Sequence, residues 1–279
     1  MAAILLDTHR VAKPWGRHAL WPGFANPEAD ADPIGEVWFQ VPEGFPDELL
    51  VKYLFTSEKL SVQVHPNDTD AVRAGHLRGK DEAWLVLDAE PDSTIALGTL
   101  EPMSPAALRA AAMDGSIEHM LDWKPVQPGD YFYSPAGTVH AIGAGITLIE
   151  VQQNIDLTYR LYDYGRPREL HLDAGVSASD ARPFEAKPVP QSPSPSRKLL
   201  AQGPKFVLER WEPAEFRVNL KPGQTAWLVP VTGSGRADGI DWQAGQCLAL
   251  TGESVVTMAE DGDVLFAYPG DELADIRIA

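Results

Sequence analysis

The sequence of 279 residues lacks several features that would each define a class of protein. It contains one cysteine, Cys247, which excludes an internal disulfide framework and fits a reducing compartment. No apolar run approaches the length of a membrane span, and residues 1–7 lack the basic start and long apolar core of a signal peptide. We therefore expect a soluble, cytoplasmic protein that does not act at a membrane.

Positive charge is also scarce, because 23 Lys and Arg face 40 Asp and Glu and give a formal net charge of −17. Nucleic acids and anionic membranes favour clustered Lys and Arg, so the sequence predicts neither as a partner. If the ligand is itself an anion, a few local cations must attract it, since the overall charge repels it.

Hydrophobic and turn-forming residues are plentiful. Hydrophobic residues make up 44% of the chain, which suffices for a sizeable core, and 23 Gly and 24 Pro are scattered along it. This composition is typical of many short strands joined by turns. In the first part of the chain we predict strands over residues 34–41, 50–55, 60–65, 82–88, 93–97, 131–134, 138–142, 146–153, 159–162 and 169–172. Residues 9–24 are expected to be irregular.

Helices are predicted in a small insertion within this β region. Ser104 and Pro105 suit the N-cap and the first position of a helix over 106–113, and residues 117–123 extend the helical insertion. A shorter helix, capped by Asp68 or Thr69, is expected to reach about residue 75.

Five prolines with interleaved serines, between positions 183 and 195, predict a semi-rigid linker over 183–198. We therefore expect one domain over 1–182 and a second β domain over 199–279. Strands in the second are predicted at 205–211, 215–220, 226–231, 247–250, 254–258 and 264–268. All seven histidines precede the linker, so the second domain has no imidazole for a metal and is expected to be structural.

The segment 60–65 carries the first functional signal. Gln63 and His65 are two positions apart on a predicted strand, so they project from the same face. A metal ion is the commonest reason to pair an amide and an imidazole in this way. Taken alone, His65 or His140 would more often be an ordinary buried residue than a metal ligand.

The segment 129–140 supplies the second signal. Gly129 is followed by five residues, Pro-x-Gly, two residues and His140. This spacing is similar to the second sequence motif of the cupins, which are small metal-binding jelly-roll barrels. The usual Asn is absent, since position 144 is Ala. The first cupin motif is altered as well: Gln63 takes the place of one His, and Glu82 comes 17 residues after His65.

The altered set closely resembles the type I phosphomannose isomerases, in particular their short bacterial form. The resemblance runs from about residue 13 to 175 and rests on several motifs in order. They are WG at 15–16, IGEVW at 34–38, SVQVHP at 61–66, GKDEAW at 79–84, PAGTVHA at 135–141, EVQQNID at 150–156, YR at 159–160 and ELHL at 169–172. The resemblance implies a mainly β fold with two cupin-like jelly-roll barrels and a small helical insertion in the first.

The resemblance further implies that Gln63, His65, Glu82 and His140 bind one catalytic Zn²⁺. Two imidazoles, a carboxylate and an amide oxygen suit zinc, while Mn, Fe, Co or Ni also fit this donor set. No thiolate is among the ligands, which favours a site with an exchangeable water. The implied reaction interconverts mannose 6-phosphate and fructose 6-phosphate through a cis-enediol.

Several further residues match the family's pocket. Lys80 and Arg160 match its active-site Lys and Arg, and Ser61 matches a Ser that contacts phosphate. Arg160 is assigned to phosphate contact or to catalysis near C1 and C2. Asp156 matches an acidic residue of the pocket, and strand alternation places it on one face with Glu150, Gln152 and Asn154. Glu150, Asp156, Lys80 and a metal-bound water are all candidates for the base at C2.

Two alternatives stay open: a non-catalytic metal cupin that binds a sugar or sugar phosphate, and an iron-dependent cupin oxygenase. Lys80 and Arg160 favour the isomerase, because an oxygenase does not need them. The enzyme is expected to be a monomer or a homodimer. No role is predicted for His171, and Trp15, Arg166 and Arg168 are expected in ordinary packing or a solvated loop.

Overall fold

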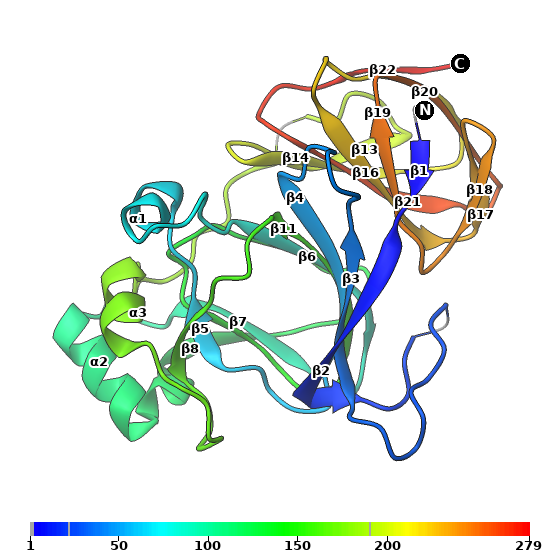
Figure 1. Ribbon diagram of the computed structural model, residues 1–279. Coiled ribbons are helices and arrows are strands. Elements are labelled where there is room, and N and C mark those ends of the chain that lie inside the picture. The colour runs from blue at the N-terminus through cyan, green and yellow to red at the C-terminus, as the bar shows by residue number, and fades with distance from the viewer. Residues whose placement is uncertain (1–2, 22, 190) are drawn as a thin grey trace.

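The computed structural model describes residues 3–21, 23–189 and 191–279 and consists of two antiparallel β-barrels with a small group of helices on the outside of the first (Figure 1). Met1, Ala2, Pro22 and Pro190, which belong to segments discussed above, lie outside the described residues. No helix within the described ranges is both long and apolar enough to cross a membrane.

The first barrel pairs a six-stranded sheet with a five-stranded one. The strands of the larger sheet are, in order across it, β2 (Asp7–Arg17), β3 (Ile34–Gln40), β4 (Leu49–Phe55), β11 (Ile146–Gln153), β6 (Glu82–Ala89) and β9 (Tyr131–Ser134). Those of the smaller sheet are β12 (Tyr159–Tyr162), β5 (Val62–Val64), β10 (His140–Ile142), β7 (Thr94–Thr99) and β8 (Leu121–Pro125).

The second barrel repeats this pairing. Its larger sheet has the order β1 (Ala3–Leu5), β19 (Leu248–Thr251), β16 (Thr225–Thr232), β21 (Asp263–Pro269), β14 (Phe206–Trp211) and β13 (Arg197–Gln202). Its smaller sheet has the order β18 (Ile240–Gln243), β17 (Ser234–Ala237), β20 (Glu253–Met258), β15 (Glu215–Asn219) and β22 (Asp275–Ile278). Strand β1 therefore joins the second barrel, whereas β2 belongs to the first (Figure 1).

The helices are α1 (Asp68–Arg73), α2 (Pro105–Asp114), the 3₁₀ helix η1 (Ser116–Met120) and α3 (Leu172–Ala178). In α2 the Ser104 hydroxyl accepts a hydrogen bond from the backbone N–H of Ala107, and Pro105 occupies the first turn, as the sequence predicts. Leu108, Ala111 and Ala112 lie on one side of α2 and pack on the outer face of the five-stranded sheet.

Along the strands of the six-stranded sheets, successive side chains point to opposite faces and therefore enter different hydrophobic cores. In β4, Leu49, Val51, Tyr53 and Phe55 pack between the two barrels, against residues of the second barrel such as Phe206 and Trp227. Leu54, on the opposite face of β4, belongs to the core inside the first barrel. The interior of the second barrel is filled by aromatic rings, including Trp211, whose ring centroid lies 4.2 Å from that of Phe216 and 4.1 Å from that of Phe266.

Most predicted strands are confirmed, with shifted ends for 60–65 and 138–142, where only Val62–Val64 and His140–Ile142 are strand. The prediction of irregular structure over residues 9–24 is wrong for 9–17, because β2 continues to Arg17, and is confirmed for 18–21 and 23–24. As a sheet edge with irregular register, β2 accommodates Pro14, which would break a central strand.

Three further predictions are wrong. Residues 169–172 form no strand, and α3 begins at Leu172. The cap of α1 is Asn67, whose side chain accepts from the N–H of Asp70, and not Asp68 or Thr69. Residues 117–123 are helical only to Met120, after which β8 begins at Leu121 and pairs with β7.

The boundaries of the proposed domains and linker stay a prediction. Within the segment 183–198, Pro183 forms a bridge with Gly98, and Phe184 packs against the core inside the first barrel. This end of the segment therefore lies along the first barrel.

The second barrel contains a buried ion pair between Arg197 and Glu209. Arg197 and Glu209 are 5% and 0% exposed, and two guanidinium nitrogens each lie 2.8 Å from a Glu209 oxygen. Trp211 Nε1 and the Tyr268 hydroxyl also donate to this carboxylate. Removing one partner of such a pair leaves a buried, uncompensated charge.

We expect Glu209→Ala to lower the free energy of unfolding by about 3–5 kcal/mol, because Arg197 stays buried without its partner. Urea unfolding followed by tryptophan fluorescence measures this. The control is Glu215→Ala, which removes a partly exposed partner of Arg217 and should cost no more than about 1 kcal/mol. Equal losses for the two variants would contradict the prediction.

Candidate active site

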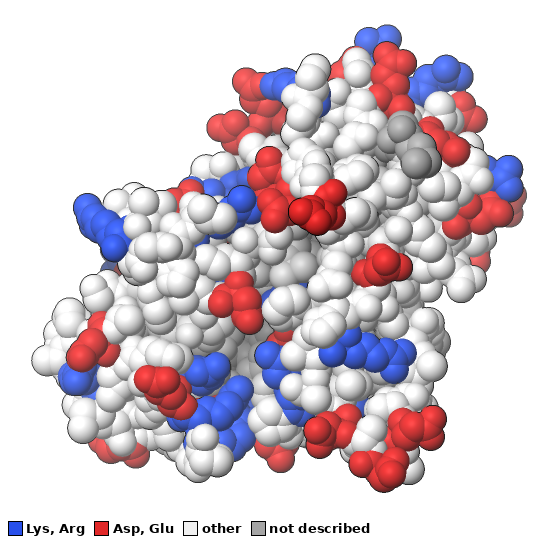
Figure 2. Space-filling model, viewed as in Figure 1, with Lys and Arg blue, Asp and Glu red and all other residues white. Residues whose placement is uncertain are grey.

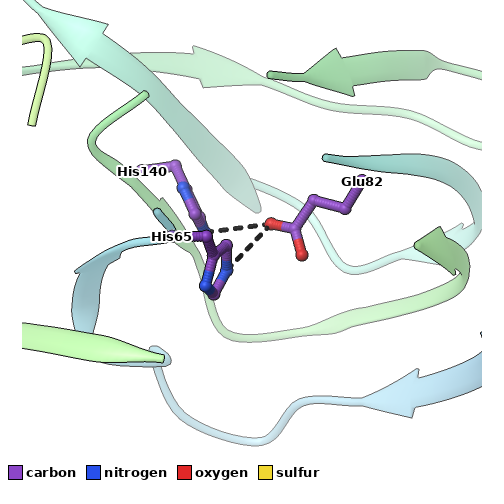
Figure 3. Close-up of side chains that lie close together, drawn as sticks. All are labelled: His65, Glu82 and His140. Atoms are coloured by element: carbon purple, nitrogen blue, oxygen red, sulfur yellow. Dashed lines mark ion pairs between the residues drawn. The ribbon is translucent and has the colours of Figure 1, made fainter. Parts of the chain in front are cut away.

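Three side chains from both sheets of the first barrel meet inside it (Figure 3). His65 follows β5 directly, and His140 opens β10, the neighbouring strand in the smaller sheet. Glu82 opens β6 in the larger sheet. The three residues are each 1% exposed, and one candidate ligand atom from each lies within 4.8 Å of the others.

The contacts among these residues converge on one oxygen. Glu82 Oε1 lies 3.0 Å from His140 Nε2 and 3.4 Å from His65 Nε2. The opposite ring nitrogens face backbone carbonyls: His65 Nδ1 lies 2.8 Å from Leu157 O, and His140 Nδ1 lies 2.9 Å from Thr138 O. A carbonyl oxygen only accepts hydrogen bonds, so each Nδ1 carries the proton and each Nε2 presents a lone pair.

This arrangement fits a divalent cation. Burial, assisted by the nearby Lys80 ammonium, lowers the pKa of His65 to about 3, so the ring is neutral and able to act as a ligand. Glu82 Oε1 is buried and has no hydrogen-bond donor, because the two nitrogens nearest to it present lone pairs. A cation between the three atoms would satisfy all of them, and the N₂O donor set suits zinc and its neighbours.

Gln63 lies beside this group, since it pairs with His140 across the β5–β10 ladder. Its amide nitrogen is 3.2 Å from His140 Nε2, and its amide oxygen accepts from the Ser61 hydroxyl at 3.1 Å. The amide oxygen thus points away from the three other residues, and a half-turn of the amide would direct it toward them. The role of Gln63 as a fourth ligand stays a prediction.

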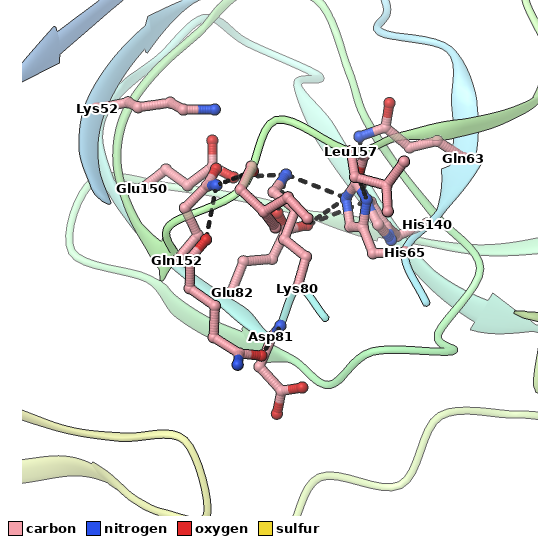
Figure 4. Close-up of polar contacts among 12 residues, drawn as sticks. Lys52, Gln63, His65, Lys80, Asp81, Glu82, His140, Glu150, Gln152 and Leu157 are labelled. Atoms are coloured by element: carbon pink, nitrogen blue, oxygen red, sulfur yellow. Dashed lines mark hydrogen bonds and ion pairs between the residues drawn. The ribbon is translucent and has the colours of Figure 1, made fainter. Parts of the chain in front are cut away.

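Lys80 borders the same group and links it to a second carboxylate (Figure 4). Its Nζ lies 2.7 Å from Glu82 Oε2, 3.4 Å from Glu150 Oε1 and 3.2 Å from His65 Nε2. Burial by itself would lower the pKa of Lys80, but Glu82 and Glu150 outweigh burial and raise it, so Lys80 is charged. For Glu150, burial dominates over the attraction of Lys80 and raises the pKa to about 7.

These groups open into a cavity of about 320 Å³. It is lined by Ser61, Gln63, Lys80, Glu82, Glu150, Asp156 and Arg160 among the predicted residues, and also by Lys13, Trp15, Glu36, Lys52, Leu54, Leu60, Trp84, Ile142, Leu157, Thr158, Arg168 and His171. Five of the lining side chains carry Lys or Arg cations. On the face shown in Figure 2, blue side chains gather around a hollow between the helical region and β2, although the protein is acidic overall.

The position of Asp156 differs from the expectation that it shares a strand face with Glu150. Strand β11 ends at Gln153, and Asn154 turns toward Asp47, to which its amide donates at 3.3 Å. Asp156 is exposed in the following loop and lines the rim of the cavity, while Glu150 is buried in its wall.

Sequence reasoning missed several lining residues. Glu36 and Lys52 are 8% and 4% exposed, and Lys52 Nζ lies 4.5 Å from the centroid of the Trp38 ring. Their placement at inward-facing positions of hydrophobic strands is the signal that could have identified them. Arg168 and His171, expected in a solvated loop or without a role, also line the cavity, and the backbone N–H of Arg160 donates to His171 Nδ1.

The fold and this buried group of two imidazoles and a carboxylate define a cupin-type protein with two barrels. A crystal structure of mannose 6-phosphate isomerase from Bacillus subtilis superposes with a TM-score of 0.81 at 24% identity, over 96% of this chain and 99% of that chain. A variant of phosphomannose isomerase from Salmonella typhimurium gives a TM-score of 0.71 at 15% identity, over 97% of this chain and 100% of that chain.

Sequence comparison specifies the relationship further. Mannose-6-phosphate isomerase from Streptococcus mutans is 37% identical over 199 residues, or 67% of this chain, and ManA from Bacillus subtilis, another mannose-6-phosphate isomerase, is 41% identical over 156 residues, or 51%. Over these segments the chain is similar in sequence to mannose-6-phosphate isomerases, and its fold is similar to that of the two solved structures. The matches span 62% and 49% of these two relatives' own length, and no family model matches the chain.

We expect His140→Ala to lower zinc affinity at least about tenfold, because it removes one of the three converging ligand atoms. Competition with a chromogenic chelator measures the affinity, and elemental analysis after dialysis gives the metal content. The exposed His119 provides the control, His119→Ala, which should retain the wild-type affinity. A zinc affinity that is the same in the two variants would show that His140 is not a ligand.

Proposed function

We propose that this chain is a zinc-dependent aldose–ketose isomerase that interconverts mannose 6-phosphate and fructose 6-phosphate. The observation that carries the proposal is one cavity lined both by Glu82, which contacts His65 and His140, and by an Arg160 available for an anion. Among the described residues, Lys13, Lys52, Lys80 and Arg168 of the cavity each form an ion pair, whereas Arg160 forms none. The names of the relatives supply the substrate.

Arg160 is the proposed anchor for the phosphate. Its one side-chain hydrogen bond within the described structure goes from Nη1 to the carbonyl of Glu169, at a long 3.3 Å. A guanidinium with donors left over suits a phosphate, which it can bind through two parallel hydrogen bonds. We propose that Ser61, which is buried at the cavity wall, contributes a hydroxyl to the sugar phosphate as well.

The proton transfers need one group that accepts a proton near neutral pH and one that stays charged. We propose that Glu150 accepts the proton from C2 of the open-chain sugar, because its pKa of about 7 is near the value at which a base is most effective. The aldehyde oxygen gains a proton to give the cis-enediol. A proton then adds at C1 while the hydroxyl on C2 loses its own, which yields the ketone.

Lys80 is not suited to accept a proton, since its raised pKa keeps it charged. We propose that the Lys80 ammonium stabilises the negative charge that develops on O1 and O2 and holds Glu150 in place. Asp156, at the exposed rim, is proposed to bind a sugar hydroxyl. Binding a sugar phosphate alone would not require the buried Lys80–Glu150 pair, and we therefore prefer the enzyme to the non-catalytic binder.

Zinc would be held by His65, Glu82 and His140, with Gln63 as the proposed fourth ligand, and would supply Lewis-acid stabilisation of oxygen charge. A cytoplasmic location, and a monomer or homodimer as the working state, stay predictions.

A coupled assay of fructose 6-phosphate formation from mannose 6-phosphate tests the proposal directly. We expect turnover that is lost on treatment with a chelator and restored by about one equivalent of zinc per chain. Absence of turnover in the zinc-loaded protein would exclude the isomerase and leave the sugar-phosphate binder.

We expect Lys80→Ala and Arg160→Ala to keep bound zinc but to lose activity. The first removes the charge near the reacting oxygens and should lower kcat about 10²-fold or more. The second should mainly raise KM, because it removes the phosphate anchor. Steady-state kinetics together with metal analysis measure both effects, and Lys124→Ala, at the half-buried partner of Asp122, is the control. Normal kcat/KM in both site variants would contradict the assigned roles.

A further inference from the structure

Lys205 of the second barrel forms an ion pair with α1, close to the segment that carries Lys80 and Glu82. Lys205 lies between β13 and β14, and its ammonium pairs with Asp68 Oδ2 on α1 of the first barrel. Among the described residues this is the one ion pair that joins residues 199–279 to the first barrel. Its backbone is fixed, since the Gly270 N–H donates to Lys205 O at 2.9 Å and the adjacent Phe206 is buried between the barrels.

Asp68 connects the chain after His65 with the chain before Lys80. Its Oδ1 accepts the backbone N–H of Gly79 at 2.7 Å, and the Lys80 N–H donates to Pro66 O at 3.1 Å. The two segments touch so closely that a Cβ on Gly79 would lie 2.5 Å from Pro66 O. Only glycine allows this approach, and the hydrogen bond from the Gly79 N–H to the Asp68 carboxylate stabilises it.

The same carboxylate oxygen also holds the far side of the Lys80–Glu82 segment. The Gln153 amide donates to Asp68 Oδ1 at 3.0 Å, and its oxygen accepts the Asp81 N–H at 3.0 Å. The Asp81 carboxylate, which Figure 4 shows pointing away from the two histidines, accepts from Tyr133 and from the N–H of Ala136. Lys80 and Glu82 flank Asp81 and therefore point the other way, into the cavity.

We propose that Lys205 is a positioning residue of the active site, supplied by the second barrel. It orients the Asp68 carboxylate, which fixes the Gly79–Glu82 backbone and thereby the separation of Lys80, Glu82 and Glu150. This inference rests on the proposed isomerase function for its kinetic consequence, but not for its structural one. The second barrel, for which no metal ligands are predicted, would then position active-site residues as well as cover the first barrel.

The zinc-loaded full-length protein carries the test. We expect Lys205→Ala to lower kcat about 3- to 30-fold with little change in KM, because the phosphate contact at Arg160 is untouched. Lys205→Arg keeps the charge and should restore most of the activity. Lys221→Ala removes a solvent-exposed partner of Glu272 on the same barrel and should behave like the wild type.

Hydrogen–deuterium exchange distinguishes positioning from mere stabilisation. In Lys205→Ala the amides of residues 79–82 should exchange at least about threefold faster, while those inside the second barrel keep their protection. Lys205→Ala combined with Asp68→Asn should be no slower in turnover than the more impaired single variant, since both changes break one connection. A lower Tm with unchanged kcat and unchanged exchange at 79–82 would overturn the inference.

The two proposals fail differently. If the wild-type protein shows no isomerase turnover, the proposed function is wrong, and exchange at residues 79–82 still decides the role of Lys205. If turnover is present but Lys205→Ala matches Lys221→Ala in kcat and in exchange, the function stands and the inference falls.

Discussion

The central constraint in this molecule is the meeting of two neutral imidazoles and a carboxylate that are almost fully buried. A buried carboxylate needs donors or a cation, and the two rings beside Glu82 offer lone pairs because their other nitrogens donate to backbone carbonyls. The surrounding structure supplies charge of both signs in turn: Lys80 next to Glu82, then Glu150 next to Lys80. The chemistry proposed for the cavity depends on this order of charges.

The barrel architecture makes such a site possible. The central strands β4 and β11 of the larger first sheet have one face against the second barrel and one face inside their own barrel, so both faces are removed from solvent. Apolar residues such as Tyr53 and Phe55 fill the first of these faces, and polar ones such as Lys52 and Glu150 stand on the second. The interior of the second barrel, by contrast, contains stacked aromatic rings.

Much of the fold and part of the site could be predicted from the sequence, and each success has a specific physical reason. Alternation located most strands, and fixed spacing from Gly129 to His140 located one end of the site, because a turn and a corner determine where the next strand begins. The proximity of His65, Glu82 and His140 followed from the family resemblance and is seen in the structure.

What could not be predicted has equally specific causes. A charged residue at alternate strand positions normally indicates a solvent face, so the burial of Glu36 and Lys52 was missed, although the hydrophobic strands around them were a signal of it. Helix α3 was missed because Gly175 weakens helical propensity, yet that glycine lets the helix approach within van der Waals contact of Leu161, where a Cβ would come within 2.8 Å of a methyl carbon. The network around Asp68 joins residues from positions 68, 79, 153 and 205, and no local pattern encodes such an encounter.

The position of strand β1 also affects the order in which parts of the molecule can fold. It lies at the edge of a sheet whose other members are all encoded after residue 196, and its partner β19 begins at Leu248. Strand β1 therefore cannot pair with its neighbour until the chain has been made at least as far as residue 250. This pairing closes a loop that contains the entire first barrel, and contacts between residues so far apart in the sequence form more slowly than local ones.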